Sequence, residues 1–146
     1  MSFQTGTIAI GSDHRAREII DGIAEHLEHL GWKVHKHYGG DADSVDYPCI
    51  ADEVTNEIVS GEAVCGVLIC GSGIGMSMAA NKTDGIRAAL VHEPNTAEMS
   101  RRHNDANVLC LAAYGSLDND YNTIIDTWLA TDFEGGRHQR RVDQMR

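Results

Sequence analysis

Short apolar runs alternate along the chain with longer segments in which apolar residues recur every three or four positions. Such runs, bounded by glycine or polar residues, are typical of buried strands, and the longer spacing is that of helices with one apolar face. Residues 64–70 form the most apolar run, which predicts a central strand, whereas residues 33–38 alternate apolar and basic side chains as a more exposed strand does. The predicted strands are Thr7–Gly11, Lys33–Tyr38, Val64–Cys70, Arg87–Val91 and Val108–Ala112.

Helical segments lie between these strands. In the first of them, Ile19, Ile23 and Leu27 share one face, and Ser12 and Asp13 ahead of it are good N-cap residues. Strands that alternate with helices predict an α/β fold, a doubly wound, Rossmann-like parallel sheet of five strands with helices on both faces. No repeat or linker interrupts the series, so residues 1–146 are expected to form a single domain. Further helices are expected over Ile50–Ile58, through Met78 and Asn81 after the turn that ends at Gly75, over Thr96–His103 and Tyr121–Ala130, and after Gly135–Gly136.

Composition and charge narrow the class of function. Hydrophobic residues make up 42% of the chain and charged residues 23%, as in ordinary globular proteins. The net charge of −10 argues against nucleic acid as a partner, because phosphate backbones are bound by basic surfaces. No apolar run approaches the roughly 20 residues that span a bilayer, and no secretory signal is recognisable, so no membrane partner is expected. The four cysteines lack Cys-x-x-Cys spacing, which favours a reducing cytoplasm and free thiols.

The turn Cys70–Gly75, Cys-Gly-Ser-Gly-Ile-Gly, follows the predicted central strand. Ligands of doubly wound sheets bind beyond the carboxyl ends of the strands, so a site is expected here. The alternating Gly71, Gly73 and Gly75 allow backbone amides to converge on a bound oxygen, and the positive end of the following helix favours a thiolate at Cys70. A thiolate beside such amides is suited to abstract a carbon-bound proton and to form an enediolate. The local pattern fits a plain strand-to-helix turn equally well.

Two better-known glycine-rich motifs fit this turn poorly. A dinucleotide-binding fingerprint needs glycine or alanine where Met76 stands, and it normally follows the first strand. A P-loop needs a Gly-Lys-Ser/Thr sequence that is missing. A nucleotide-binding domain is therefore a weak alternative, which calorimetry with NAD or ATP would test.

Other clusters carry less information. Met76 and Met78 are expected to pack in the core. His35 and His37 could share a metal on one strand, but no further ligands stand at the spacing of a zinc site, so no metal site is predicted.

Two more segments carry polar residues suited to a small substrate. Asp13 and His14 end the first strand and are expected to reach the same crevice as the glycine turn, although a capping aspartate and a surface histidine are the simpler interpretation. His103 and Asn104 end the fourth helix, where a solvated helix cap is likewise the simpler interpretation.

Arg137 and Arg141 stand four residues apart on the predicted C-terminal helix, so they share one face, with His138 beside them. Two guanidinium groups arranged in this way form a good phosphate clamp. A solvated basic tail is the alternative, and this segment alone favours it.

Together these segments resemble the type B ribose-5-phosphate isomerases, in the family that also contains the galactose-6-phosphate isomerase subunits. The resemblance covers nearly the full chain, and its motifs occur in the same order and at the same spacing. They are Ser12-Asp13-His14, Asp46-Tyr47-Pro48, Ile69 to Gly75, Ala79 to Lys82, Gly85 to Ala88, Ser100 to Asp105, Asn107-Val108-Leu109 and Glu134 to Arg141.

The resemblance implies a cofactor-independent interconversion of ribose 5-phosphate and ribulose 5-phosphate through an enediolate, with Cys70 as the base that carries the proton between C2 and C1. Ser72 and the turn amides would bind the oxygens on which charge develops, His103 would assist ring opening, and Asp13 would polarise substrate oxygens. The family is dimeric or tetrameric with active sites built from two subunits, which implies a homodimer or tetramer here, and no metal or organic cofactor is implied. The implied substrate-binding residues are Asp13, His14, Tyr47, Gly71, Gly73, Gly75, Asn104, Arg137, His138 and Arg141, of which the last three hold the phosphate.

Two positions separate this chain from other members of that family. Some members replace the cysteine and carry a glutamate at the position of Met76, so this chain, with its methionine, resembles the cysteine-using branch. Many members have a phosphate-binding arginine where Tyr114 stands, which leaves a tetrulose, allose or galactose phosphate open as the substrate. A non-catalytic sugar-phosphate-binding subunit is a further alternative, against which Cys70, Asp13 and His103 argue, since binding alone needs no proton carrier.

Overall fold

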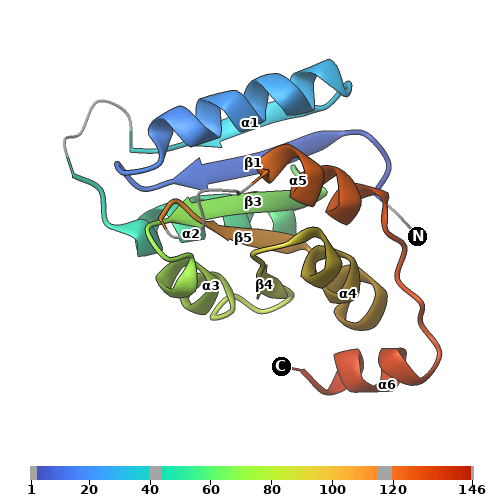
Figure 1. The fold of residues 1–146 in the computed structure, drawn as a ribbon. Coiled ribbons are helices and arrows are strands. Elements are labelled where there is room, and N and C mark those ends of the chain that lie inside the picture. Colours follow the sequence, from blue (N-terminus) through green and yellow to red (C-terminus); the bar gives the residue numbers. More distant parts are fainter. Residues whose placement is uncertain (1–2, 40–43, 115–119, 146) are drawn as a thin grey trace.

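Five parallel strands form the centre of the protein, and their order determines where a ligand can bind (Figure 1). The computed structural model describes residues 3–39, 44–114 and 120–145. The predicted doubly wound α/β fold is confirmed, and each strand begins and ends within one residue of its predicted position. The strands are β1 (Thr7–Ser12), β2 (Lys33–His37), β3 (Cys65–Cys70), β4 (Ala88–Leu90) and β5 (Val108–Ala112), paired in the order β2-β1-β3-β5-β4.

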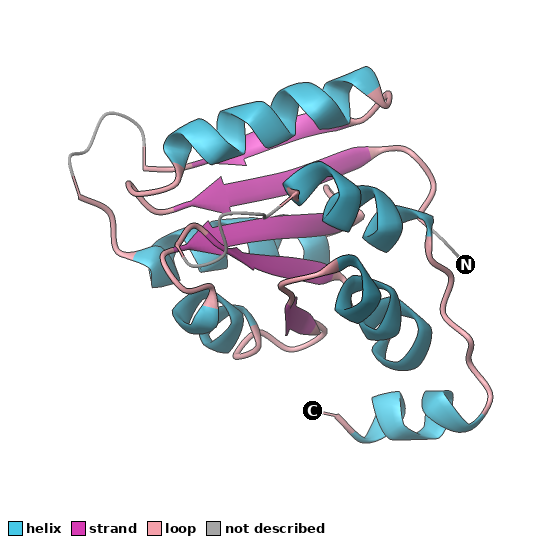
Figure 2. Ribbon diagram, viewed as in Figure 1, coloured by secondary structure: helices cyan, strands magenta, loops and turns pink. Residues whose placement is uncertain are grey.

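Helices cover both faces of this sheet (Figure 2). They are α1 (Arg17–His29), α2 (Tyr47–Val59), α3 (Ile74–Ala80), α4 (Pro94–Asn104), α5 (Tyr121–Ala130) and α6 (Arg137–Gln144). On one face Ile20 of α1, Ala97 of α4 and Trp128 of α5 join one apolar core, and on the other Ile50 of α2 and Met76 of α3 join a second. Of the helices in the described residues, none has both the length and the apolar character needed to cross a bilayer.

The burial of the strands follows their apolar patterns. All six residues of β3 are buried, because this strand is third of five and has helices over both faces. β2 lies at one edge of the sheet and keeps its side chains partly exposed. Both placements confirm the sequence-based expectations of a central and a more exposed strand.

Two local expectations are wrong. Met76 is buried in the core, but Met78 is 63% exposed, because two residues along an α-helix turn the side chain by about 200°. Neither Ser12 nor Asp13 caps α1, whose N-cap position is Ala16 and carries no side-chain cap. The chain instead makes an extra turn between β1 and α1, in which the N–H of Ala16 donates to the carbonyl oxygen of Asp13.

The crevice expected for a ligand lies between the carboxyl ends of β1 and β3. From β1 the chain passes to β2 on one side of the sheet, and the later strands lie on the other side. In open α/β sheets the loops diverge at such a point and leave a binding crevice between them. Asp13 directly follows β1 and Gly71 directly follows β3, so the fold brings both predicted loops to this crevice.

α2 is tied to the edge strand β2 by a carboxylate that two histidines share. The Nδ1 of His35 donates to Oε2 of Glu57 at 2.8 Å, and the Nε2 of His37 donates to Oε1 at 2.7 Å. Burial raises the pKa of Glu57, but the hydrogen bonds from His35 and His37 outweigh it and hold the pKa below its ordinary value of 4.5.

Because the pKa of Glu57 is lower in the folded protein than in the unfolded chain, its stabilising contribution is complete above pH 4.5 and is lost as the pH falls through the lowered pKa. We therefore expect Glu57→Gln to flatten the fall in the free energy of unfolding below pH 4.5. Urea denaturation at a series of pH values measures this slope, with Glu62→Gln on an exposed carboxylate as the control. Identical slopes for wild type and Glu57→Gln would contradict the expectation.

Candidate active site

The turn after β3 places Cys70 at the carboxyl end of the sheet, where the strand order predicts the ligand crevice. Its side chain is 5% exposed and joins the core on the face covered by α2 and α3. The carbonyl oxygens of Cys70 and Gly71 accept hydrogen bonds at 2.9 Å from the backbone N–H groups of Ala113 and Tyr114. These bonds tie the residues after β5 to the turn that carries the cysteine.

Two of the turn glycines are required by geometry. Gly73 has a φ of +77°, and a Cβ at this position would stand 2.5 Å from Cδ1 of Leu90. A Cβ on Gly75 would stand 2.5 Å from Cζ of the Tyr47 ring. The structure thus brings Tyr47, one of the implied substrate-binding residues, directly against the turn.

Ser72 is the exposed polar residue of this turn. Its Oγ accepts a hydrogen bond from the backbone N–H of Ile74 at 3.2 Å. A hydroxyl that accepts in this way can still donate its proton to another oxygen. Ser72 is therefore placed to donate to a substrate oxygen beside Cys70.

Asp13 and His14 have fixed orientations at the end of β1. Asp13 is 3% exposed, and its backbone N–H donates to the carbonyl oxygen of Ile69 on β3. Its Oδ1 accepts from the N–H of Arg15 at 3.0 Å. The Nδ1 of His14 accepts from the N–H of Val45 at 3.2 Å, which assigns a ring proton to Nε2. His14 thus offers an N–H donor rather than an acceptor.

His103 and Asn104 lie at the opposite edge of the sheet. α4 starts beyond the carboxyl end of β4 and runs back along the sheet, so its last turn reaches the amino ends of the strands (Figure 1). The carbonyl oxygen of Asn104 accepts from Nε of Arg87, the residue before β4. A helix of 11 residues spans about 16 Å, so one chain does not bring His103 and Cys70 together.

The residues predicted to hold the phosphate gather with His103 rather than with Cys70. The ring of His138 on α6 stacks on the ring of His103, with centroids 4.3 Å apart and planes 11° apart. His138 is buried, whereas Arg137 and Arg141 are exposed. Burial, together with the charges of His103 and Arg137, lowers the pKa of His138.

This second cluster could be taken for a metal site. The ligand atoms of His103, Glu134 and His138 lie within 4.8 Å of one another. However, the lone pairs of each imidazole lie in its ring plane, and the planes of two rings stacked 4.3 Å apart do not meet within bonding distance of both nitrogens. Glu134 is also paired with Arg102, whose hydrogen bond lowers the pKa of the carboxylate. With the guanidinium of Arg137 nearby, the cluster favours an anion over a metal cation.

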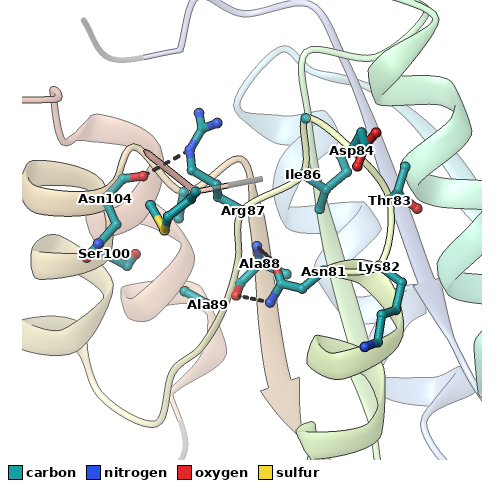
Figure 3. A pocket seen from close by; sticks show the side chains of 13 residues that line it. Asn81, Lys82, Thr83, Asp84, Ile86, Arg87, Ala88, Ala89, Ser100 and Asn104 are labelled. Atoms are coloured by element: carbon teal, nitrogen blue, oxygen red, sulfur yellow. Dashed lines mark hydrogen bonds between the residues drawn. The ribbon is translucent and has the colours of Figure 1, made fainter. Parts of the chain in front are cut away.

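A cavity of about 890 Å³ lies beside the end of α4 (Figure 3). It is lined by residues 81–89, Ser100, Asn104, Ala106 and Met145, and none of them belongs to the Cys70 turn. Asn81 covers the edge of β4, where its side chain donates to the carbonyl oxygen of Ala88 at 2.9 Å and accepts from the N–H of Ala88 at 2.8 Å. The predicted site residues omit Asn81, although it lies in one of the motifs that carry the family resemblance. No local sequence pattern indicates that the Asn81 side chain forms hydrogen bonds with a strand.

Comparisons with known proteins cover almost the whole chain. The sequence model of the family described as Ribose/Galactose Isomerase matches residues 8–145. Ribose-5-phosphate isomerase B of Escherichia coli K12 is 41% identical over 136 residues, which cover 93% of this chain and 91% of that one. The solved structure of Clostridium thermocellum ribose-5-phosphate isomerase B superposes with a TM-score of 0.87 at 44% identity, covering 94% of this chain and 93% of that chain. Ribose-5-phosphate isomerase B from Mycoplasma genitalium, solved with bound ribulose-5-phosphate, gives a TM-score of 0.86 at 38% identity, with 97% and 95% covered. The chain belongs to the ribose/galactose isomerase family.

Proposed function

We propose that this protein interconverts ribose 5-phosphate and ribulose 5-phosphate, with residues 1–146 acting as one catalytic domain. The observation that carries the proposal is the full-length relationship to ribose-5-phosphate isomerase B proteins, one of them solved with ribulose-5-phosphate bound. The position of Cys70 at the crevice between β1 and β3 supports it, because this is where the fold holds small ligands.

Cys70 is the proposed proton carrier. Its thiolate removes the proton from C2 of the open-chain aldose, and the electron pair of that bond forms the enediolate across C1 and C2. The same proton returns to C1, while the hydroxyl proton moves from O2 to O1, so the ketose forms without net oxidation. Ser72 and the turn amides are the proposed donors to the enediolate oxygens, with the Nε2–H of His14 as a further donor. Because the reaction needs no external electron acceptor, we propose no cofactor.

We further propose that the active site is completed by a second copy of the chain. Asp13, His14 and Cys70 lie at the carboxyl edge of the sheet, whereas His103 and the α6 arginines lie at the amino edge. A symmetric pair of copies can place the amino-edge cluster of one over the carboxyl edge of the other. His103 would then carry the proton that ring opening moves from O1 to the ring oxygen, Asn104 would contact the sugar, and Arg137, His138 and Arg141 would bind the phosphate.

Mixing two inactive variants tests the shared site. We expect Cys70→Ser and His103→Ala to be nearly inactive alone. A mixed dimer holds one site with both changes and one intact site, so random mixing should recover about one quarter of the wild-type activity. The measurement is turnover after joint refolding, with heterodimers confirmed by differently tagged chains. Mixing Cys70→Ser with the double variant is the control, because no intact site can form. Verified heterodimers without activity would place both residues in one chain's site.

Tyr114 favours a second candidate for the substrate. Tyr114 is 60% exposed beside the Cys70 turn, at a position where many relatives carry a phosphate-binding arginine. The same proton transfer on a four- or six-carbon sugar phosphate is therefore the second candidate. We expect ribose 5-phosphate to give the highest kcat/KM in a panel of four-, five- and six-carbon aldose phosphates. A higher value for another member would reassign the substrate without changing the chemistry.

We propose a cytoplasmic location. All four cysteines, Cys49, Cys65, Cys70 and Cys110, are free thiols. Free thiols persist in reducing compartments, and a thiolate base depends on them.

A further inference from the structure

Arg15 lies at the catalytic edge of the sheet, two residues after Asp13. Its Nη1 stands 3.2 Å from the point that a Cβ on Gly71 would occupy, and Cε2 of Tyr114 stands 3.0 Å from the same point. The guanidinium of Arg15 and the ring of Tyr114 therefore lie directly against Gly71, the residue after Cys70. A side chain at position 71 would push both groups away, so glycine allows this close approach. We call the surface that these two groups form over Gly71 the slot.

Arg15 brings positive charge to this slot. Among the residues that the structure describes, no ion pair involves its guanidinium, although the backbone N–H of Arg15 donates to the Asp13 carboxylate. The neighbouring Arg17 is directed elsewhere, since it donates to the carbonyl oxygen of Tyr38 and lies over that ring. The phenol of Tyr114 offers a hydroxyl but no cation at neutral pH.

We propose that Arg15 binds the substrate phosphate from within the subunit that supplies Cys70. This inference rests on the proposed function as a sugar-phosphate isomerase. The exposed guanidinium can form charge-assisted, paired hydrogen bonds with phosphate oxygens. Arg137 and Arg141 reach the same phosphate only from a second copy, so Arg15 is the phosphate contact that each chain provides for its own thiol.

The phosphate, rather than the reacting carbons, is the part of the substrate that Arg15 contacts. Side chains of consecutive residues at a strand end point to opposite faces of the sheet. The Cys70 side chain joins the core under α2 and α3, so the slot over Gly71 opens on the other side of the strand end. A substrate whose C1 and C2 lie at the thiol must extend over the strand end to reach Arg15. The phosphate end of that substrate then lies at the slot.

The first test is the substitution Arg15→Gln, which removes the charge and keeps much of the side chain. We expect KM for ribose 5-phosphate to rise about 10- to 100-fold, with kcat changed by less than about threefold. The inhibition constant of inorganic phosphate should rise by a similar factor. Lys33→Gln, which removes an equal charge at the amino end of β2, is the matched control and should change neither value. An unchanged KM, or a loss confined to kcat with an unchanged phosphate inhibition constant, overturns the proposal.

The second test moves the charge to the neighbouring side chain. Because Tyr114 flanks the same slot, the double variant Arg15→Gln/Tyr114→Arg should recover most of the lost affinity for inorganic phosphate and for ribose 5-phosphate. No recovery in a folded double variant contradicts the assigned slot.

Calorimetry separates failure of this inference from failure of the proposed function. Ribose 5-phosphate is titrated into Cys70→Ala and into Cys70→Ala/Arg15→Gln, where no turnover occurs. Weaker binding in the double variant supports Arg15 whatever the wild-type rate, and equal binding overturns it. A wild-type protein that binds ribose 5-phosphate but does not isomerise it contradicts only the proposed function.

Discussion

Replacing Cys70 by alanine is expected to lower kcat for ribose 5-phosphate by about 10²- to 10⁴-fold, the usual contribution of a positioned proton carrier. Affinity for the sugar phosphate should change little, because the thiol contacts the reacting carbons while the phosphate is held elsewhere. Steady-state turnover and calorimetric titration of the same variant separate these two effects. Transfer of a deuterium label from C2 of the aldose to C1 of the ketose should be lost in parallel with turnover.

A matched thiol provides the control for this experiment. Cys49→Ala removes an exposed cysteine on α2 and should leave kcat and KM unchanged. If Cys70→Ala turned over at the wild-type rate, another group would be the base. Met76, which lies in the same apolar core as Cys70, has no proton-accepting group.

Replacing Asp105 by alanine is expected to lower the free energy of unfolding by about 3 kcal/mol, because it leaves a buried guanidinium without its carboxylate. Arg101 is 2% exposed, and its Nη1 donates to Oδ1 of Asp105 at 2.8 Å and to the carbonyl oxygen of Ala106 at 2.7 Å. Nη2 of Arg87 also donates to Asp105 at 3.2 Å. The carboxylate therefore joins the end of α4 to the start of β4, next to His103.

Chemical denaturation measures this loss, and Asp105→Asn is the matched variant. Asp105 has a φ of +47°, a left-handed conformation that asparagine adopts more readily than alanine. Asparagine keeps a hydrogen-bond acceptor but removes the charge, so it should cost less than alanine. Equal and small losses for both variants would show that Arg101 is satisfied by its carbonyl partners alone.

Much of the fold can be predicted from local patterns in the chain. The apolar run ending at Cys70 identifies the central strand, because only a strand with helices over both faces can bury every side chain. The alternation of strands and helices predicts the doubly wound sheet, and the carboxyl-edge rule then places Asp13 and Cys70 at one crevice. The prediction of which residues of a helix are buried is less secure. Met78 shows this, since an apolar residue in a short helix can face solvent.

The division of the site into two clusters depends on the tertiary structure. Local patterns mark His103 and Arg137 as candidates, but they do not reveal that α4 carries His103 to the edge opposite Cys70. That separation follows from the path of the chain through the sheet, and the spacing of residues within one sequence motif does not reveal this path.

The surroundings of Cys70 also depend partly on the sequence alone and partly on the tertiary structure. By itself the sequence determined that a cysteine followed by alternating glycines ends a buried strand, because burial and backbone freedom are local properties. Only the tertiary structure decided which side chains meet over that turn. Arg15 and Tyr114 come from loops after different strands, and both approach Gly71 because the ends of β1, β3 and β5 lie side by side in the sheet.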